Sequence, residues 1–342
     1  MAVIGIDTHK RTLAACAVDG LGGVIAERTF GCDPDGLAEL VRWARPLAVD
    51  GRVGVEGSAS YGAPAARMLV AAGLEVREVP PHLSRSERGR TRRPGKSDPG
   101  DALAIARVTL REPMLPPVRL DDRTEEIGLL VDAREELVNA QTQARNRLHA
   151  HLVVLVPGYG RTASQLVSPR QLDAIEALLA PLPGTRAELA RALLEDLRLL
   201  GSRARELHGR IARLVAGHPL LQLPGVGVLT AAWLIAEVGD VDRFSSPAAF
   251  AMFAGVAPIP ASSGQSQRMR LNRGGNRRLN RALYTIALVQ VWHHPPAKAY
   301  LARKRSEGMS WAEAMRCLKH RIARPVFRLL QAGQSDLLGL AA

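Results

Sequence analysis

The first eighty residues alternate between short apolar runs and amphipathic stretches, and this alternation limits the folds open to the chain. The apolar runs have the length and the β-branched content of strands, and they lie at 3–7, 13–19, 24–30, 52–58 and 74–80. Helical spacing marks the stretches at about 35–44 and 61–73. Strands that alternate with helices predict an α/β layer in which helices cover the faces of one sheet.

Two acidic residues lie at strand ends in this predicted sheet. Asp7 closes the first run, VIGID, and Glu56 lies near the end of the run that contains VGVEG. Active groups in such sheets gather at the carboxyl ends of strands. An acid that closes an apolar strand costs free energy unless an arginine pairs with it or a metal ion coordinates it. His9 follows closely, and we expect it to be a surface histidine rather than a metal ligand.

A second acidic pair lies in the stretch KSDPGDALAIARV, Lys96 to Val108. Asp98 precedes Pro99, a residue that suits the first turn of a helix, so Asp98 and Asp101 fit the roles of helix cap and dipole partner. The same spacing puts both carboxylates on one helix face, where they suit Mg²⁺, a cation that binds hard oxygen ligands. Together, four acids from two strand ends and one helix start would form the two-metal clamp of phosphodiester chemistry.

From about residue 121 the pattern changes to long helices. Residues 122–155 are helical, although Arg134 and Gln141 fall where an apolar stripe is expected. Residues 186–216 carry a seam of two apolar residues per heptad, as in a coiled coil. The seam consists of Leu193, Leu197, Leu200, Ala204, Leu207, Ile211 and Leu214. It predicts packing either against a helix of the same subunit or against a second copy of the chain.

The third part of the chain opens with an apolar turn, L-P-G-V-G, that leads into an apolar helix within 220–240. This resembles the hairpin of a helix-hairpin-helix, in which glycines let backbone N–H groups approach a phosphate; a plain tight turn is the alternative. Residues 258–283 are polar and rich in glycine and arginine before they become helical, and the remainder to about residue 330 is helical and basic.

The charge of the chain is positive and clustered. The formal net charge is +13 and the sequence pI is about 10.6, values typical of nucleic-acid-binding proteins. Residues 85–96 hold six Lys or Arg against one acid, and residues 268–281 hold six arginines and no acid. Arginine suits phosphate because its planar fork donates two parallel hydrogen bonds. A phosphate-bearing partner is therefore predicted.

The cysteines and the hydropathy exclude several other classes of protein. Cys16, Cys32 and Cys317 are far apart, so neither a zinc ribbon nor a disulfide framework is supported, and a reducing cytosol is the expected setting. The N-terminus does not have the pattern of a signal peptide. No stretch reaches the roughly 18 apolar residues of a membrane span, so we expect no membrane partner.

Two sets of motifs resemble one family. GIDTHK, VGVEGS and KSDPGDALAIARV look like the RuvC-like domain of bacterial insertion-sequence transposases of the Asp-Glu-Asp-Asp group, insertion-sequence 110, which is related to Piv-type DNA invertases. LPGVGVLTAAWLIAEVGDVDRFSSPAAFAMFAGVAPIPASSG followed by RLNRGGNRRLNRAL resembles the Transposase-20 domain of that family. The resemblance covers both ends of the chain in order.

The resemblance implies an architecture of three parts. These are an α/β RuvC/RNase H-like N-terminal domain over 1–115, a long-helix coiled-coil middle over 116–218, and a mainly α C-terminal Transposase-20 domain over 219–342. The implied function is a DNA transposase or recombinase of the bacterial cytoplasm, associated with the nucleoid. Its partners would be donor and target DNA, a structured guide (bridge) RNA, and further copies of the chain in a homodimer or homotetramer.

The resemblance also implies residue roles. Asp7, Glu56, Asp98 and Asp101 match the acidic quartet of the family and would bind Mg²⁺ or Mn²⁺. Ser263, before Gly264, matches the serine that attacks DNA covalently, although Ser262 is adjacent. Because the nearest histidines are His293 and His294, activation of the hydroxyl by the metals of the acidic site is expected. The residues expected to contact nucleic acid are Arg88, Arg90, Arg92, Arg93, Lys96, Arg268, Arg270, Arg273, Arg277 and Arg278.

Two other functions stay open at this point. A metal-dependent, junction-resolving nuclease would use the same carboxylates with water as the nucleophile. A nucleic-acid-binding protein without catalysis would use only the hairpin and the arginines. Acids beside a phosphate path repel DNA unless a cation intervenes, so the four placed carboxylates disfavour the second of these.

Overall fold

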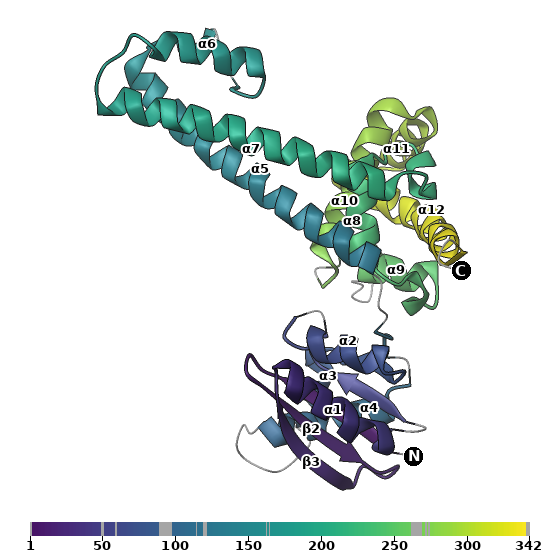
Figure 1. The fold of residues 1–342 in the computed structure, drawn as a ribbon. Helices are drawn as coiled ribbons and strands as arrows, with labels where there is room; N and C mark the ends of the chain where they lie inside the picture. The colour runs from purple at the N-terminus through teal and green to yellow at the C-terminus, as the bar shows by residue number, and fades with distance from the viewer. Residues whose placement is uncertain are drawn as a thin grey trace. The chain divides into compact units, whose positions relative to one another are not determined.

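The chain folds into two compact units, Met1–Asp121 and Asp122–Ala342. The computed structural model describes residues 2–48, 51–58, 60–88, 98–113, 115–118, 122–161, 163, 165–260, 269–270, 272 and 274–339 (Figure 1). Among the helices in these ranges, none is both long enough and apolar enough to span a bilayer. Each unit has hydrophobic cores of its own.

Unit 1 is built on one five-stranded sheet. Its strands are β1 (Val3–Thr8), β2 (Thr12–Val18), β3 (Val24–Gly31), β4 (Arg52–Val55) and β5 (Glu75–Glu78), in the order β3-β2-β1-β4-β5. β1, β2 and β3 form an antiparallel meander, whereas β1, β4 and β5 run parallel. All five predicted strands are present, and their arrangement confirms the predicted RuvC/RNase H-like fold class.

Helices cover both faces of this sheet because strand residues alternate between the two faces. Ile4 and Ile6 of β1 pack in a core with α1 (Pro34–Leu47) and α2 (Ala63–Ala71). Val3 packs on the opposite face with α4 (Asp98–Arg111), and α3 (Pro81–Arg88) packs beside α4. Gly5 and Asp7 follow Val3 at a spacing of two, so they share the face that α4 covers.

Two glycines let α4 lie directly on the sheet. A Cβ on Gly5 would overlap the backbone nitrogen of Ala106 and would lie 2.7 Å from its Cα. A Cβ on Gly54 would overlap the Thr109 hydroxyl. Each glycine precedes an acidic residue by two positions, Asp7 and Glu56. The close approach of α4 therefore positions the helix beside the strand ends that carry the acids.

Gly5→Ala is expected to destabilise unit 1 severely. The added methyl group meets backbone atoms of α4, which cannot move aside as a flexible side chain does, so the loss should be about 3 kcal/mol or more, at or above the upper end for overpacking. Urea denaturation of the full chain measures it. Gly20→Ala is the matched control because no atom lies within 4 Å of the position that its methyl group would take. Equal stabilities of the two variants would contradict this account of the packing.

Unit 2 begins with a pair of long helices, α5 (Asp122–Leu155) and α7 (Thr185–Val215), that run side by side, with α6 (Pro169–Leu179) against α7 (Figure 1). The seam of α7 therefore packs within the subunit, which is one of the two expected alternatives. Leu197, Ala204 and Ile211 are buried as predicted, whereas Leu193, Leu200, Leu207 and Leu214 are only half-buried. Leu194 and Val215 are buried beside Leu193 and Leu214, so the predicted seam is confirmed at three positions and shifted by one residue at two.

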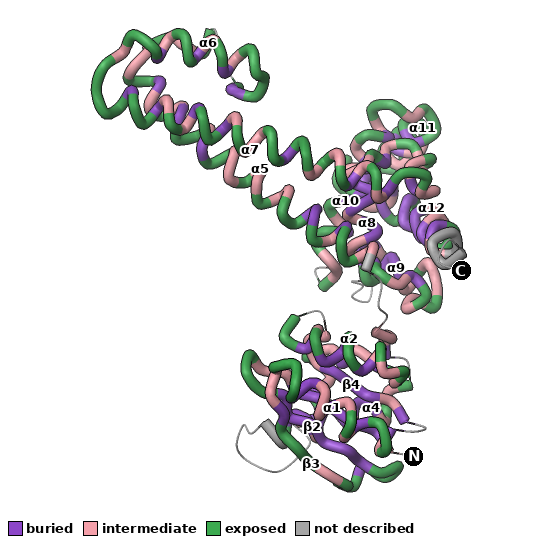
Figure 2. Tube along the Cα trace, viewed as in Figure 1, coloured by how far each residue is buried: buried purple, intermediate pink, exposed green. Residues whose placement is uncertain are grey.

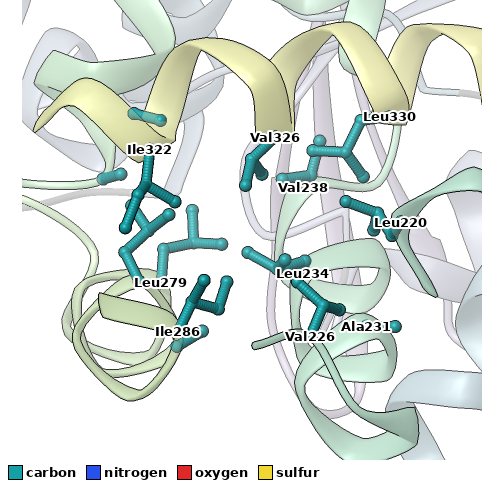
Figure 3. Packing of buried hydrophobic residues seen from close by; sticks show 14 of the residues in the cluster. Leu220, Val226, Ala231, Leu234, Val238, Leu279, Ile286, Ile322, Val326 and Leu330 are labelled. Carbon is teal, nitrogen blue, oxygen red and sulfur yellow. The ribbon is translucent and has the colours of Figure 1, made fainter. Parts of the chain in front are cut away.

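The rest of unit 2 is a helical bundle with one small hairpin. It contains α8 (Val228–Val238), α9 (Pro247–Phe253), α10 (Arg277–His293), α11 (Pro295–Ser306) and α12 (Trp311–Gly339), the 3-10 helices η2 (Pro219–Gln222) and η3 (Val241–Arg243), and the strands β6 (Ile259–Pro260) and β7 (Met269–Arg270). A further 3-10 helix, η1 (Tyr159–Arg161), lies between α5 and α6 in the chain. Side chains of α8, α10 and α12 meet in its core, among them Leu234, Ile286 and Val326 (Figure 3). The buried stripe of α12 continues along much of its length (Figure 2).

Candidate active site

The first two predicted acids lie at neighbouring strand ends of unit 1. β1 and β4 are parallel with Ile6 paired to Val55, so Asp7 and Glu56 occupy the next position on each strand. The Glu56 N–H donates to the Ile6 carbonyl at 3.2 Å, and the Thr8 hydroxyl donates to the Glu56 carbonyl at 3.0 Å. The backbone thus holds the two acidic positions together at one edge of the sheet.

Asp101 joins this edge from α4. It lies in the first turn of the helix, one residue before Ala102, whose carbonyl faces Gly5. Its side chain is almost fully buried, with 4% of the residue exposed, and Arg88 Nη1 lies 3.0 Å from Asp101 Oδ1. Asp98 begins the same helix, and its spacing puts it on the face of Asp101; its side chain lies outside the described part of the chain.

Asp7 shows that three carboxylates interact. Burial raises the pKa of the Asp7 carboxyl, and the nearby carboxylates of Asp101 and Glu56 raise it further, while His9 and the Thr8 N–H act in the opposite direction. Asp7 Oδ2 lies 3.1 Å from His9 Nε2 but is buried without an aligned hydrogen-bond partner. The expected surface histidine therefore lies against an acid of the site.

One short helix, α3, supplies partners to two of these acids. The fully buried Ser84 hydroxyl donates to Glu56 Oε2 at 2.9 Å, and Arg88, one turn later, pairs with Asp101. Glu87 accepts from Arg111 at 2.7 Å, which ties α3 to α4. The sequence pattern assigned Arg88 to nucleic acid and gave no sign of Ser84, because the inward face of α3 depends on how α3 packs on α4.

On the hypothesis that Glu56 binds a divalent cation, Ser84→Ala is expected to weaken cation binding by roughly 10- to 100-fold, the usual effect of losing an outer partner of a metal ligand. The substitution removes the donor that orients the Glu56 carboxylate. The cation dependence of the melting temperature gives the apparent affinity without any need for activity. Ser86→Ala, at an exposed position of the same helix, should bind cations like the parent protein. Identical cation affinities for both variants would rule out the role of Ser84.

Glu78 is a further, half-buried acid, and it was not among the predicted site residues. It ends β5, where it pairs with Val55, and it accepts from the Ser58 N–H at 2.9 Å. Burial raises the pKa of Glu78, N–H donors of the Glu56–Ser58 turn lower it, and Glu56 raises it further. The sequence signal that could have identified Glu78 was the run LEVRE. It predicts a further strand, and Glu78 lies at the end of that strand.

The chemistry of these donors fits a hard divalent cation. All the anionic groups are carboxylates, Asp7 and Asp101 are buried, and no described residue donates an aligned hydrogen bond to Asp7 Oδ2. In the ranges that the structure describes, no group of three or more His, Cys, Asp or Glu side chains is arranged to hold a metal ion. Arg88 and Ser84 occupy oxygens of Asp101 and Glu56 instead, so a cation at this edge has to displace or share those contacts.

The predicted serine segment belongs to unit 2. β6 and β7 pair antiparallel, with Ile259 opposite Arg270, and Ser262 and Ser263 fall in the chain between them, outside the described residues. Three asparagines spaced by four residues fix the neighbouring backbone. Asn272 donates to the Met252 carbonyl at 3.0 Å, Asn276 donates to Glu237 at 2.7 Å, and Asn280 donates to the Gly255 carbonyl at 2.8 Å. The pattern N-x-x-x-N-x-x-x-N was a sequence signal for this scaffold.

The predicted nucleic-acid residues have different surroundings. Arg278 is engaged by three carboxylates, Asp132 at 2.6 Å, Glu237 at 3.1 Å and Glu135 at 3.4 Å, so it links α10 to α5 and α8. Arg277 is exposed at the start of α10. The side chains that lie outside the described part of the chain are those of Arg90, Arg92, Arg93, Lys96, Arg268, Arg270 and Arg273.

The L-P-G-V-G turn packs on α10. Gly225 has a φ of +87°, and a Cβ there would lie 2.9 Å from the Ile286 carbonyl. The Gln290 amide donates to the Pro224 carbonyl at 2.7 Å. Gly227 caps α8 with open space around it. One glycine therefore serves internal packing, and only the other faces open space as a phosphate-binding hairpin requires.

Comparisons with known proteins match most of the chain. A DEDD-type, IS110 family model described as "Transposase" matches residues 4–157, and a model described as "Transposase IS116/IS110/IS902 family" matches residues 217–302. The chain is 27% identical to the "Insertion element IS900 uncharacterized 42 kDa protein" of Mycobacterium paratuberculosis, over 96% of this chain and 95% of that protein. It is 28% identical to the "Insertion element IS110 uncharacterized 43.6 kDa protein" of Streptomyces coelicolor, over 70% and 71% of the two chains.

One solved structure also resembles part of the chain. "T. thermophilus RuvC in complex with Holliday junction substrate" matches at 18% identity and a TM-score of 0.28. The match covers 34% of this chain and 99% of that one. A likeness at that score does not bear on function, whereas the two family models together span most of the residues.

Proposed function

Because the chain belongs to the IS110 family of transposases, it is an enzyme that cuts and rejoins DNA, and we propose that it does so with a divalent cation and a covalent serine intermediate. The observation that supports the cation most strongly is the burial of Asp7 and Asp101 beside Glu56. Carboxylates that raise the pKa of a buried neighbour are costly in their ionised forms unless a cation compensates them.

The acidic quartet would hold the cation. Asp7, Glu56 and Asp101 would be ligands from unit 1, with Asp98 added from the first residue of α4. Mg²⁺ or Mn²⁺ bound there would neutralise charge on a scissile phosphodiester and polarise its oxygens. Ser84 would orient Glu56, and the guanidinium of Arg88, once separated from Asp101, would turn to a DNA phosphate.

Ser263 is the proposed nucleophile, with Ser262 as the adjacent alternative. Attack of Ser263 Oγ on phosphorus forms one phosphoester as another breaks, and the hydroxyl proton passes to the leaving oxygen. A second attack by a strand hydroxyl reverses this exchange and releases the serine. The number of phosphoesters is unchanged, so rejoining needs no external source of energy. Water in place of serine would instead give a junction-resolving nuclease.

A structured guide RNA is the proposed source of target choice. With only 4% aromatic residues and six arginines in 268–281, the chain is better suited to hold backbones than to recognise bases, and pairing by a guide would supply the sequence information. A homodimer or homotetramer would handle the two DNA partners together. A chain that stays monomeric at micromolar concentration with DNA and RNA present would argue against this assembly.

The test is recombination by the full chain in bacterial cells. A plasmid that carries the joined element ends and a second plasmid that carries a target are supplied with the chain and the flanking non-coding segment of its element. Rejoined donor–target junctions are expected, and they should disappear when the non-coding segment is deleted. Nicked or linear products without rejoined junctions would favour the nuclease, and the absence of any product with a folded protein would overturn the proposal.

A further inference from the structure

Unit 2 contains a groove that neither the sequence motifs nor the family comparisons assign. It has a volume of about 870 Å³ and lies between α12, α11, the end of α10 and the start of α9, with the Leu223–Pro224 turn at one side. We call it the α12 groove. Its size falls in the range of binding pockets for small molecules, so it can take a few nucleotides but not a duplex.

Three arginines of α12 give this groove its charge. Arg321, Arg324 and Arg328 line it at a spacing that places them on one helix face over about 10 Å of the axis. All three are exposed. None forms an ion pair with a described residue, whereas Arg278 and Arg198 each contact two or more carboxylates. No Asp or Glu lines the groove among the described residues, so its positive charge is not compensated by them.

The remaining lining is suited to sugar and base surfaces. Leu318, Ile322 and Ala297 provide an apolar floor that belongs to the hydrophobic core of unit 2; Ile322 is labelled in Figure 3. The Tyr300 ring lies beside it, and the guanidiniums of Arg303 and Arg321 lie 5.3 and 5.1 Å from the centroid of that ring. His294 Nδ1 is buried without a hydrogen-bond partner among the described residues, and His294 lines the groove. The groove thus combines exposed arginines, an apolar floor and a polar atom without a partner among the described residues.

We propose that the α12 groove binds the sugar-phosphate backbone of a single-stranded nucleic-acid segment. Three aligned guanidiniums match successive phosphates of one strand, and the aromatic and apolar lining matches the bases and sugars beside them, the combination that single-strand binding surfaces use. An acidic peptide would satisfy the charge but would not place sugars and bases against the apolar floor. The inference rests on the proposed function only in that the strand belongs to the DNA or RNA on which the enzyme acts.

Binding of labelled 12-residue single strands to the full chain in EDTA tests this proposal. RNA and DNA strands of one mixed sequence are compared, so the two arms identify which strand the groove takes. Simultaneous Arg321→Gln, Arg324→Gln and Arg328→Gln should weaken binding of at least one strand by roughly 10- to 100-fold at 0.1 M salt and should lower the salt slope by about 2. Melting temperatures verify that the variant folds.

The control removes three exposed arginines from α7, Arg186, Arg203 and Arg205, each replaced by Gln. Three results would each overturn the proposal. The groove variant could bind as tightly as the parent chain, the control variant could lose as much binding, or a poly-glutamate peptide could bind equally tightly and depend on the same arginines. The binding assay requires neither a cation nor cleavage. If the groove-dependent binding is found but the chain does not recombine DNA, the result counts against the proposed function and not against the groove.

Discussion

Asp7→Asn is expected to abolish strand cutting while raising the melting temperature of the chain in EDTA. The carboxylate is buried and its pKa is raised by burial and by Asp101 and Glu56, so the ionised form costs stability when no cation is present. Asparagine has nearly the same shape without the charge. Loss of a cation ligand should remove several kcal/mol of transition-state stabilisation, more than about 10³-fold in rate.

The stability difference between Asp7→Asn and the parent chain should depend on pH. A folded-state pKa above the ordinary value of 3.8 means that folding favours the protonated acid, so the contribution of Asp7 to stability is lost as pH rises through the raised pKa. The stabilisation by Asp7→Asn should therefore be small near pH 4 and grow toward neutral pH. Thermal melts from pH 4 to 7 in EDTA measure it, and saturating Mg²⁺ should reduce or reverse the difference by binding only to the parent protein.

Asp196→Asn provides the matched control, because Asp196 is exposed on α7 and makes the same change of charge. It should alter neither activity nor the Mg²⁺ dependence of melting. A lower melting temperature for Asp7→Asn in EDTA at pH 7, or strand cutting at the parent rate, would contradict the account of the acidic edge.

Ser263→Ala is expected to eliminate the protein–DNA adduct that survives denaturation. The parent chain, incubated with Mg²⁺, labelled element-end DNA and its guide, should give a band that SDS does not dissociate and that protease removes. Without the hydroxyl, no serine phosphoester can form, and rejoined products should fall to background because rejoining depends on that ester. Binding of DNA in EDTA should stay at the parent level.

Three further variants make this result specific. Ser266→Ala lies in the same stretch of sequence and should keep the adduct, whereas Ser262→Ala identifies the nucleophile if Ser263→Ala keeps activity. Full recombination by the double variant Ser262→Ala, Ser263→Ala would eliminate the covalent serine mechanism. Cut DNA with no adduct in the parent chain would favour attack by water.

Local patterns predicted most elements of unit 1. Apolar runs such as VIGID become strands because β-branched residues suit a sheet, and the expected positions of Asp7 and Glu56 at strand ends agree with the structure. The same holds for the long helices, since residues 122–155 form α5. These features depend on sequence spacing alone.

Features that depend on packing were not predicted. Which face of α3 turns toward Glu56 and Asp101 follows from its contact with α4, so Ser84 and the Arg88–Asp101 pair could not be found from spacing. α5 presents the polar Gln141 opposite Gly201 of α7, with 3.0 Å between the Gln141 Nε2 atom and the position of a Cβ on Gly201. Which seam residues of α7 are fully buried depends on how α5 packs against them, and the sequence of α7 alone does not contain that information.

The most direct test of the acidic edge is anomalous diffraction from crystals of the full chain with DNA, grown with Mn²⁺. We predict a manganese peak about 2 Å from carboxylate oxygens of both Asp7 and Asp101, with Arg88 moved away from its 3.0 Å contact with Asp101. A DNA-bound structure in saturating Mn²⁺ that shows no peak between these carboxylates, with the Arg88–Asp101 pair intact, would contradict the account.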